Sequence, residues 1–158
     1  MTVERFAGGA IGEPGSRVFM LEFVTSGEAV AYVIEKFQVH ALALEVQKVL
    51  QERGLIGVGL SVEPGGVHSE TPVAFRVGGL EMGIAEDSDM LSLAIISTDE
   101  DDDRVEYELS LAQLDAFARE ALAVVASGRP ACPRCGLAMD PDGHNCPRTN
   151  GDLRKHRP

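Results

Sequence analysis

Two stretches of this chain that lie 75 residues apart carry the same helical pattern of apolar side chains. One runs from Gln38 to Leu50 and the other from Gln113 to Val125, and apolar residues recur in both at spacings of three, four and seven. The paired apolar positions are Val39 with Leu114, Leu42 with Phe117, Ala43 with Ala118, Val46 with Ala121, Val49 with Val124 and Leu50 with Val125. Self-similarity at a fixed offset predicts one structural unit that occurs twice.

Each helical pattern follows three segments that are typical of β-strands and are bounded by turn sequences. The segments before the first helix are 6–11, 17–25 and 29–35, and those before the second are 73–84, 90–97 and 104–109. The same offset of 75 residues aligns Val18–Leu21 with Leu93–Ile96.

The sequence therefore predicts an α+β fold of two pseudo-duplicated β-β-β-α units, at about residues 1–54 and 73–127. We expect their strands to form a mainly antiparallel sheet or a partly closed barrel, with each helix covering an apolar face. The alternative to a true repeat is that the two segments look alike only because each contains strands, turns and a helix in the same order. The connector, residues 55–72, contains the turn sequence Pro64-Gly65-Gly66 and fits either a short strand or a loop.

The charge of the chain changes sign near Gly128. The whole chain carries −11, and residues 128–158 hold six basic and three acidic side chains, so residues 1–127 carry −14 and the tail +3. All three cysteines also follow this point. These features predict an acidic body, residues 1–127, and a small basic module, residues 128–158. An acidic surface repels phosphate, so we do not expect the chain to coat nucleic acid or anionic membranes.

The tail contains the pattern C-x2-C-x8-H-x-C, formed by Cys132, Cys135, His144 and Cys146. A two-residue spacing brings both sulfurs of the first pair to one side, and the reversal Asp140–Gly143 returns the second pair to the same ion. Three thiolates and one imidazole match tetrahedral zinc and leave no open position, which indicates a structural ion. A module this short cannot build its own core, so the zinc would supply most of its folding free energy.

Two alternatives to this zinc-ribbon-like module stay open. One is a redox pair of Cys132 and Cys135, although such a pair is more typical of a helix start. The other is a zinc site completed by different ligands, for which Asp140, Asp142 and His156 are the candidates.

The remaining candidate features favour structural roles. The acidic run Asp99–Asp103 fits a solvated hairpin tip better than a cation site, since it lacks the spacing of a calcium loop. The glycine-rich Ala7–Gly12 is no phosphate loop, and glycines within a strand more often mark a close backbone approach. His40 and His68 stand alone, without a nucleophile in a recognisable arrangement.

Gln38 and Gln113 occupy matched positions at the two helix starts, where they could cap or pack, or line a shared groove. In the second helix, Ser110 precedes Gln113 by three residues, which is a capping-box arrangement.

Three motifs of the chain together resemble a known family: Gly12-Glu-Pro-Gly15; Glu35-Lys36 with Gln38-Val39; and the closing Gly128-Arg-Pro, Cys132-Pro-x-Cys135-Gly and Asp140-Pro-x-Gly143-His144-x-Cys146-Pro147-Arg148. The chain resembles an uncharacterised bacterial family found chiefly in actinobacteria, over nearly its full length. Phe37 departs from that family, which tends to be polar there. The resemblance implies a cytoplasmic setting and supports the four zinc ligands as a matched set, but it implies no reaction.

No apolar run reaches the ~18 residues of a membrane span, and the N-terminus does not resemble a secretory signal. We therefore expect a cytoplasmic, non-enzymatic binding or adaptor protein with a structural Zn²⁺ and a protein partner.

Two other functions stay open. The first is an enzyme or small-ligand-binding protein with its site between the two halves, near Gln38, Gln113 and the connector. The second is a nucleic-acid-associated protein that acts through the basic tail, with Arg148, Arg154, Lys155 and Arg157. No catalytic residues are predicted.

Overall fold

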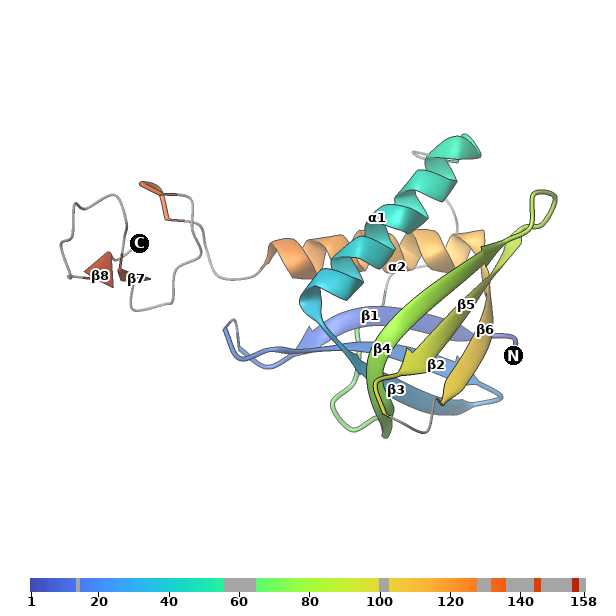
Figure 1. The fold of residues 1–158 in the computed structure, drawn as a ribbon, viewed down its shortest axis with the longest axis horizontal. Coiled ribbons are helices and arrows are strands. Elements are labelled where there is room, and N and C mark those ends of the chain that lie inside the picture. The colour runs from blue at the N-terminus through green and yellow to red at the C-terminus, as the bar shows by residue number, and fades with distance from the viewer. Residues whose placement is uncertain are drawn as a thin grey trace.

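The computed structural model describes residues 1–13, 15–55, 65–99, 103–127 and 132–135, together with the backbone of 144–145 and 155–156. Three strands and a helix come first: β1 (Arg5–Ile11), β2 (Val18–Thr25), β3 (Glu28–Ile34) and α1 (Lys36–Glu52). The same order follows again: β4 (Val73–Ile84), β5 (Met90–Ser97), β6 (Arg104–Ser110) and α2 (Leu111–Ala126). The fold is α+β, as the sequence predicts (Figure 1).

The six strands form one mixed sheet in the order β1-β2-β3-β4-β5-β6. Neighbouring strands are antiparallel except at the centre, where β3 and β4 are parallel. Of the two expected arrangements, the structure has the mainly antiparallel sheet, and the sheet is not closed. Its curl brings the N-terminus against β6, where Thr2 and Glu108 form an isolated parallel bridge.

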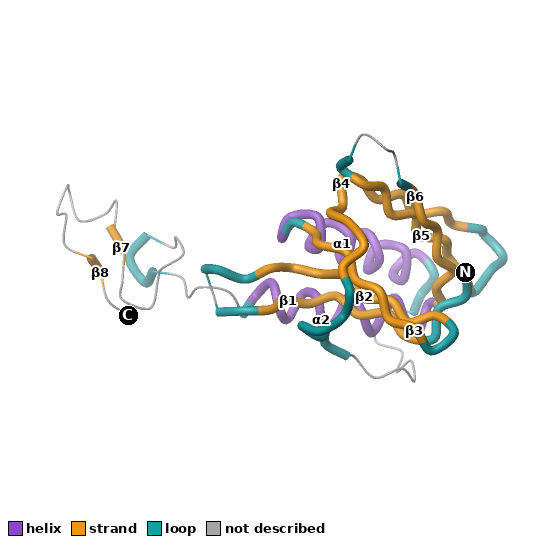
Figure 2. Tube along the Cα trace, turned by 90° about the horizontal axis from the view of Figure 1, so that it is seen from below, coloured by secondary structure: helices purple, strands orange, loops and turns teal. Residues whose placement is uncertain are grey.

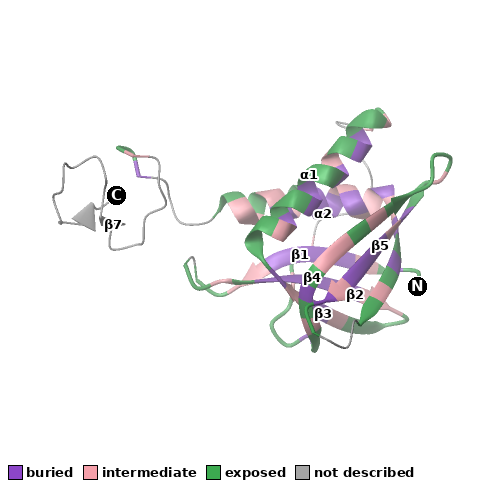
Figure 3. Ribbon diagram, in the orientation of Figure 1, coloured by how far each residue is buried: buried purple, intermediate pink, exposed green. Residues whose placement is uncertain are grey.

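Both helices lie on the same side of the sheet (Figures 1 and 2). The helix α2 packs against β1 and β6, and α1 packs on α2. The inward faces of strands and helices form one core, which appears as the buried stripes in Figure 3. No helix in the described part of the chain is long and apolar enough to cross a membrane.

Two buried tyrosines link the halves at the centre of this core. The hydroxyl groups of Tyr32 and Tyr107 lie 2.5 Å apart, and these residues are separated by 75 positions, the offset of the helices. Burial raises the pKa of both phenols, so both stay neutral.

The strand register corrects one part of the sequence alignment. In the first half Leu21 pairs with Tyr32, and in the second half Leu93 pairs with Tyr107. The structural counterpart of Leu21 is therefore Leu93, an offset of 72 residues, and the alignment of Val18–Leu21 with Leu93–Ile96 is wrong. The cause is the longer connection between β5 and β6, which an ungapped alignment cannot accommodate.

Both helices begin with a capping box, which satisfies backbone groups that a helix start leaves free. The Oε1 of Gln38 accepts the N–H of Glu35 at 2.9 Å, and the Oε1 of Gln113 accepts the N–H of Ser110 at 2.9 Å. The capping role expected for both glutamines is confirmed.

Two further short strands, β7 (His144–Asn145) and β8 (Lys155–His156), pair with each other antiparallel in the tail. Residues 128–131 lie outside the described residues, so the boundary predicted at Gly128 stays a prediction.

Candidate functional site: a groove between the first helix and the β4–β5 hairpin

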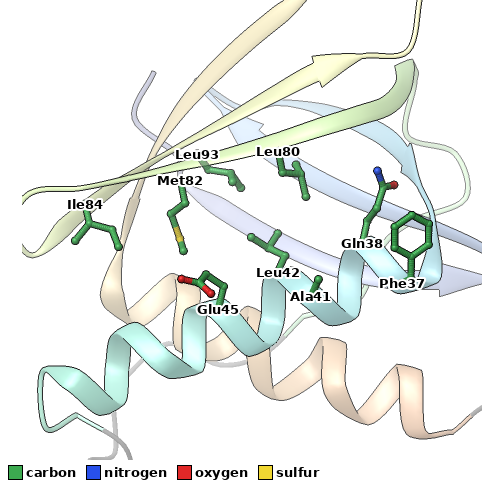
Figure 4. A pocket seen from close by; sticks show the side chains of 9 residues that line it. All are labelled: Phe37, Gln38, Ala41, Leu42, Glu45, Leu80, Met82, Ile84 and Leu93. Carbon is green, nitrogen blue, oxygen red and sulfur yellow. The ribbon is translucent and has the colours of Figure 1, made fainter.

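A cavity of about 470 Å³ lies between α1 and the hairpin of β4 and β5. Figure 4 shows side chains from both walls pointing into it. The helix contributes Phe37, Gln38, Ala41, Leu42 and Glu45, and the strands contribute Leu80, Met82, Ile84 and Leu93. Ligand sites are typically clefts of this size with mostly apolar walls and few polar groups. We call this cavity the hairpin groove.

The hairpin groove lies between the two halves of the chain, because α1 belongs to the first β-β-β-α unit and the hairpin to the second. The sequence placed a possible site between the halves near Gln38, Gln113 and the connector. Gln38 lines the groove. Gln113 does not line it, because its Nε2 donates to the carbonyl of Val3 at 2.7 Å.

One pair of equivalent positions in the two units explains why a groove forms between α1 and β4. Gly8 pairs with Leu21, and Met82 pairs with Leu93, the counterpart of Leu21. Met82 is therefore the counterpart of Gly8.

At Gly8 the missing side chain allows the helix and strand to touch. A Cβ built there would lie 2.8 Å from Cδ2 of Phe117 on α2, and nearer still to Cε2. Met82 has a long side chain at the matching place, and Leu42, the counterpart of Phe117, is smaller. The helix α1 therefore stands away from β4, and the space between them is the groove.

Arginine contacts join α1 to β4 or the hairpin turn near both ends of the helix. Near its C-terminus, Arg53 donates to the carbonyls of Ser88 at 2.5 Å and Ala85 at 2.7 Å, in the turn between β4 and β5. Near its N-terminus, Arg76 of β4 pairs with Glu35 at 2.9 Å. These contacts hold α1 to β4 and to the hairpin turn on either side of the groove.

A second polar cluster lies on the opposite face of the sheet, where Glu22 of β2 is 1 % exposed. Its Oε1 accepts from Arg5 at 2.5 Å and from Nδ1 of His68 at 2.8 Å. Its Oε2 accepts from the N–H of His68 and from Oγ1 of Thr71, both at 2.8 Å. Arg5 also donates to the carbonyl of Gly66. One buried carboxylate thus fastens the described part of the connector to the sheet.

Burial alone would raise the pKa of Glu22, but its hydrogen bonds with His68, Thr71 and Arg5 lower that pKa to about 2. An acid whose pKa is lower in the folded than in the unfolded protein stabilises the fold at neutral pH. This contribution is present above pH 4.5 and is lost as the pH falls towards 2.

The lost contribution should amount to about 3 kcal/mol of the free energy of unfolding. Urea denaturation of the wild type and of Glu22→Gln at a series of pH values measures it. The difference in free energy of unfolding between the wild type and Glu22→Gln should become smaller below about pH 4.5. A difference that stays constant down to pH 2.5 would contradict this assignment of the charge.

Of the predicted zinc ligands, the structure describes Cys132 and Cys135. Cys132 is buried and packs against Cys135, and the N–H of Arg134 donates to Sγ of Cys132 at 3.4 Å. His144 has only its backbone described, and Cys146 lies outside the described residues. The described side chains contain no group of three His, Cys, Asp or Glu that could hold an ion.

The other zinc alternatives and the basic tail lie beyond what the structure describes. Asp140, Asp142, Arg148 and Arg154 lie outside the described residues, and His156 has only its backbone described.

The structural roles expected for the remaining candidates agree with the structure. Ala7–Ile11 lies in β1, where Gly8 makes a close approach, and Asp99 and Asp103 lie between two antiparallel strands. His40 is exposed outside the hairpin groove, and His68 bonds to Glu22.

No motif of the sequence marked Glu22, Arg5, Glu45 or Met82 as a site residue. A signal for Glu22 was present, because it is the one charged residue in the apolar strand Val18–Thr25. No comparable signal marks Glu45, which looks like any solvated acid on a helix.

Residues 1–146 match a family described as "Protein of unknown function (DUF3090)", and the chain belongs to this family. The match agrees with the resemblance to an uncharacterised family. No match was found among the curated proteins or the solved structures compared with the chain.

Proposed function

We propose that this member of the DUF3090 family is a non-enzymatic binding protein and that the hairpin groove is its binding site. The observation that carries the proposal is the cavity of about 470 Å³ with apolar walls contributed by both halves. Two polar side chains among its described lining residues, Gln38 and Glu45, can orient a ligand. These described lining residues include no nucleophile paired with a base, which favours binding over catalysis.

A neutral apolar dye such as Nile red tests the proposal by fluorescence titration. We expect saturable binding of one dye per chain, and we expect Ala41→Trp to abolish it by filling the groove. Leu44→Trp is the matched control, because Leu44 is exposed on α1 but does not line the groove. Equal binding to the wild type and to Ala41→Trp would contradict the assignment of the site.

We also propose that Cys132, Cys135, His144 and Cys146 bind a structural zinc ion in the tail. The N–H of Arg134 that donates to Sγ of Cys132 supports it, because such donors stabilise a thiolate. Three thiolates and one imidazole fit zinc by their chemistry. The ion would supply folding free energy to the tail, and the proposal assigns it no reaction.

We expect the purified full-length chain to contain one zinc ion, and Cys132→Ser to lose it. Elemental analysis gives the metal content, and limited proteolysis shows whether the tail is folded. A strong chelator should make residues 128–158 protease-sensitive while the helix content of the body stays unchanged. Asp152→Asn, which alters a tail residue outside the motif, should keep the metal. A wild-type chain with reduced thiols that binds no zinc would refute the site.

A further inference from the structure

The charge inside the hairpin groove indicates what kind of ligand it takes. Among the described residues that line the groove, Glu45 is the one that carries a charge. It forms no ion pair or hydrogen bond within the part of the chain that the structure describes. Figure 4 shows Glu45 on the helical wall facing the apolar strand wall with Met82 and Ile84. The groove therefore combines apolar walls with one negative charge that lacks a described partner.

This combination favours a cation over an anion or a neutral molecule. Glu45 is exposed, so its carboxylate attracts an ammonium group with the modest strength of a surface ion pair, and it repels another carboxylate. Phe37, which is 70 % exposed at one end of the groove, offers an aromatic face as well.

Gln38 supplies a second polar contact at a fixed separation from Glu45. Its Oε1 is used in the capping box, and no described residue accepts a hydrogen bond from its Nε2. In the other half, the Nε2 of Gln113 donates to Val3. Seven residues on a helix span about 10 Å, so Gln38 can bind an acceptor about 10 Å from the charge.

The size of the groove indicates a small molecule. Its volume of about 470 Å³ lies within the range of small-molecule sites. Its apolar wall is formed by Leu42 opposite Leu80 and Met82. A straight stem of about eight carbon atoms matches the distance between Gln38 and Glu45.

We propose that the hairpin groove binds a small, elongated apolar molecule with one ammonium group, which Glu45 recognises. The inference rests on the proposed function of the groove and adds the chemical class of its ligand. The ammonium lies against the Glu45 carboxylate, the apolar stem lies between Leu42 and Met82, and an acceptor at the far end can bind Gln38.

Titration calorimetry with three probes of equal length tests the proposal on the full chain: octylammonium, octanol and octanoate. We expect octylammonium to bind about fivefold or more tighter than either of the others. Glu45→Gln should bring the three affinities within about twofold of one another. The matched control is Glu52→Gln, an exposed acid on the same helix outside the groove, which should keep the preference.

The outcomes separate this inference from the proposed function. Equal affinity for octanol and octylammonium in the wild type would overturn the ligand class but leave an apolar binding site. A preference for octylammonium that survives Glu45→Gln would also overturn it. If none of the three probes binds and Nile red does not bind either, both the ligand class and the groove as a site fail.

Discussion

Replacing Glu22 by alanine should lower the free energy of unfolding by about 3–5 kcal/mol. Glu22 accepts hydrogen bonds from Arg5, from two groups of His68 and from Thr71. Its removal leaves the buried hydroxyl of Thr71 and the partly exposed groups of Arg5 and His68 without their acceptor, and unpaired buried polar groups are costly. Urea denaturation of the full chain, followed by the helical circular dichroism signal, measures the loss.

A matched substitution and a local measurement make this prediction specific. Glu108→Ala removes an exposed strand glutamate whose side chain forms no hydrogen bond in the described structure, so it should change the stability by less than about 0.5 kcal/mol. In Glu22→Ala the amide of His68 should also exchange its hydrogen faster, because that amide donates to Oε2 of Glu22. A loss of stability below about 1 kcal/mol would mean that the connector is held by other contacts.

The sequence was sufficient for the elements because their signals are local. The capping box at Ser110 and the apolar stripe that follows it fix the start and the inward face of α2. The turn at Gly27 fixes where β2 ends and β3 begins, since Gly27 has a positive φ of 78° that favours glycine. These features depend on residues a few positions apart, which a single sequence displays.

The sheet and the groove depend on residues that are far apart in the chain, and here the sequence was insufficient. The parallel pairing of β3 with β4 leaves no local pattern, so the repeat alone could not decide between an open sheet and a partly closed barrel. The groove arises from the contrast between Gly8 and Met82. This contrast becomes visible only once the registers show that the two positions are equivalent. The sequence suggested a groove between the halves near Gln38, but it did not indicate the residues that line the cavity.

Replacing Gly8 by valine should cost about 3 kcal/mol or more, because the position is already filled by the neighbouring helix. A Cβ there would lie 2.8 Å from Cδ2 of Phe117. The ring of Phe117 is 1 % exposed and stacks on Phe6 at 4.6 Å, so it cannot move aside without disturbing the aromatic core. Either α2 must lift off β1 or the rings must repack. Urea denaturation of the purified variant measures the effect.

Gly79 on β4 provides the control, since a Cβ there would meet Ile96 at an ordinary 3.7 Å. Gly79→Val should therefore change the free energy of unfolding by less than about 1 kcal/mol. The other half of the protein also suggests a compensating change, because Leu42 stands where α2 has Phe117. The double variant Gly8→Val with Phe117→Leu should lose less stability than the sum of the single variants, by about 1 kcal/mol or more. Additive losses would show that the clash is relieved elsewhere, and that the difference between Gly8 and Met82 does not set the separation between helix and strand.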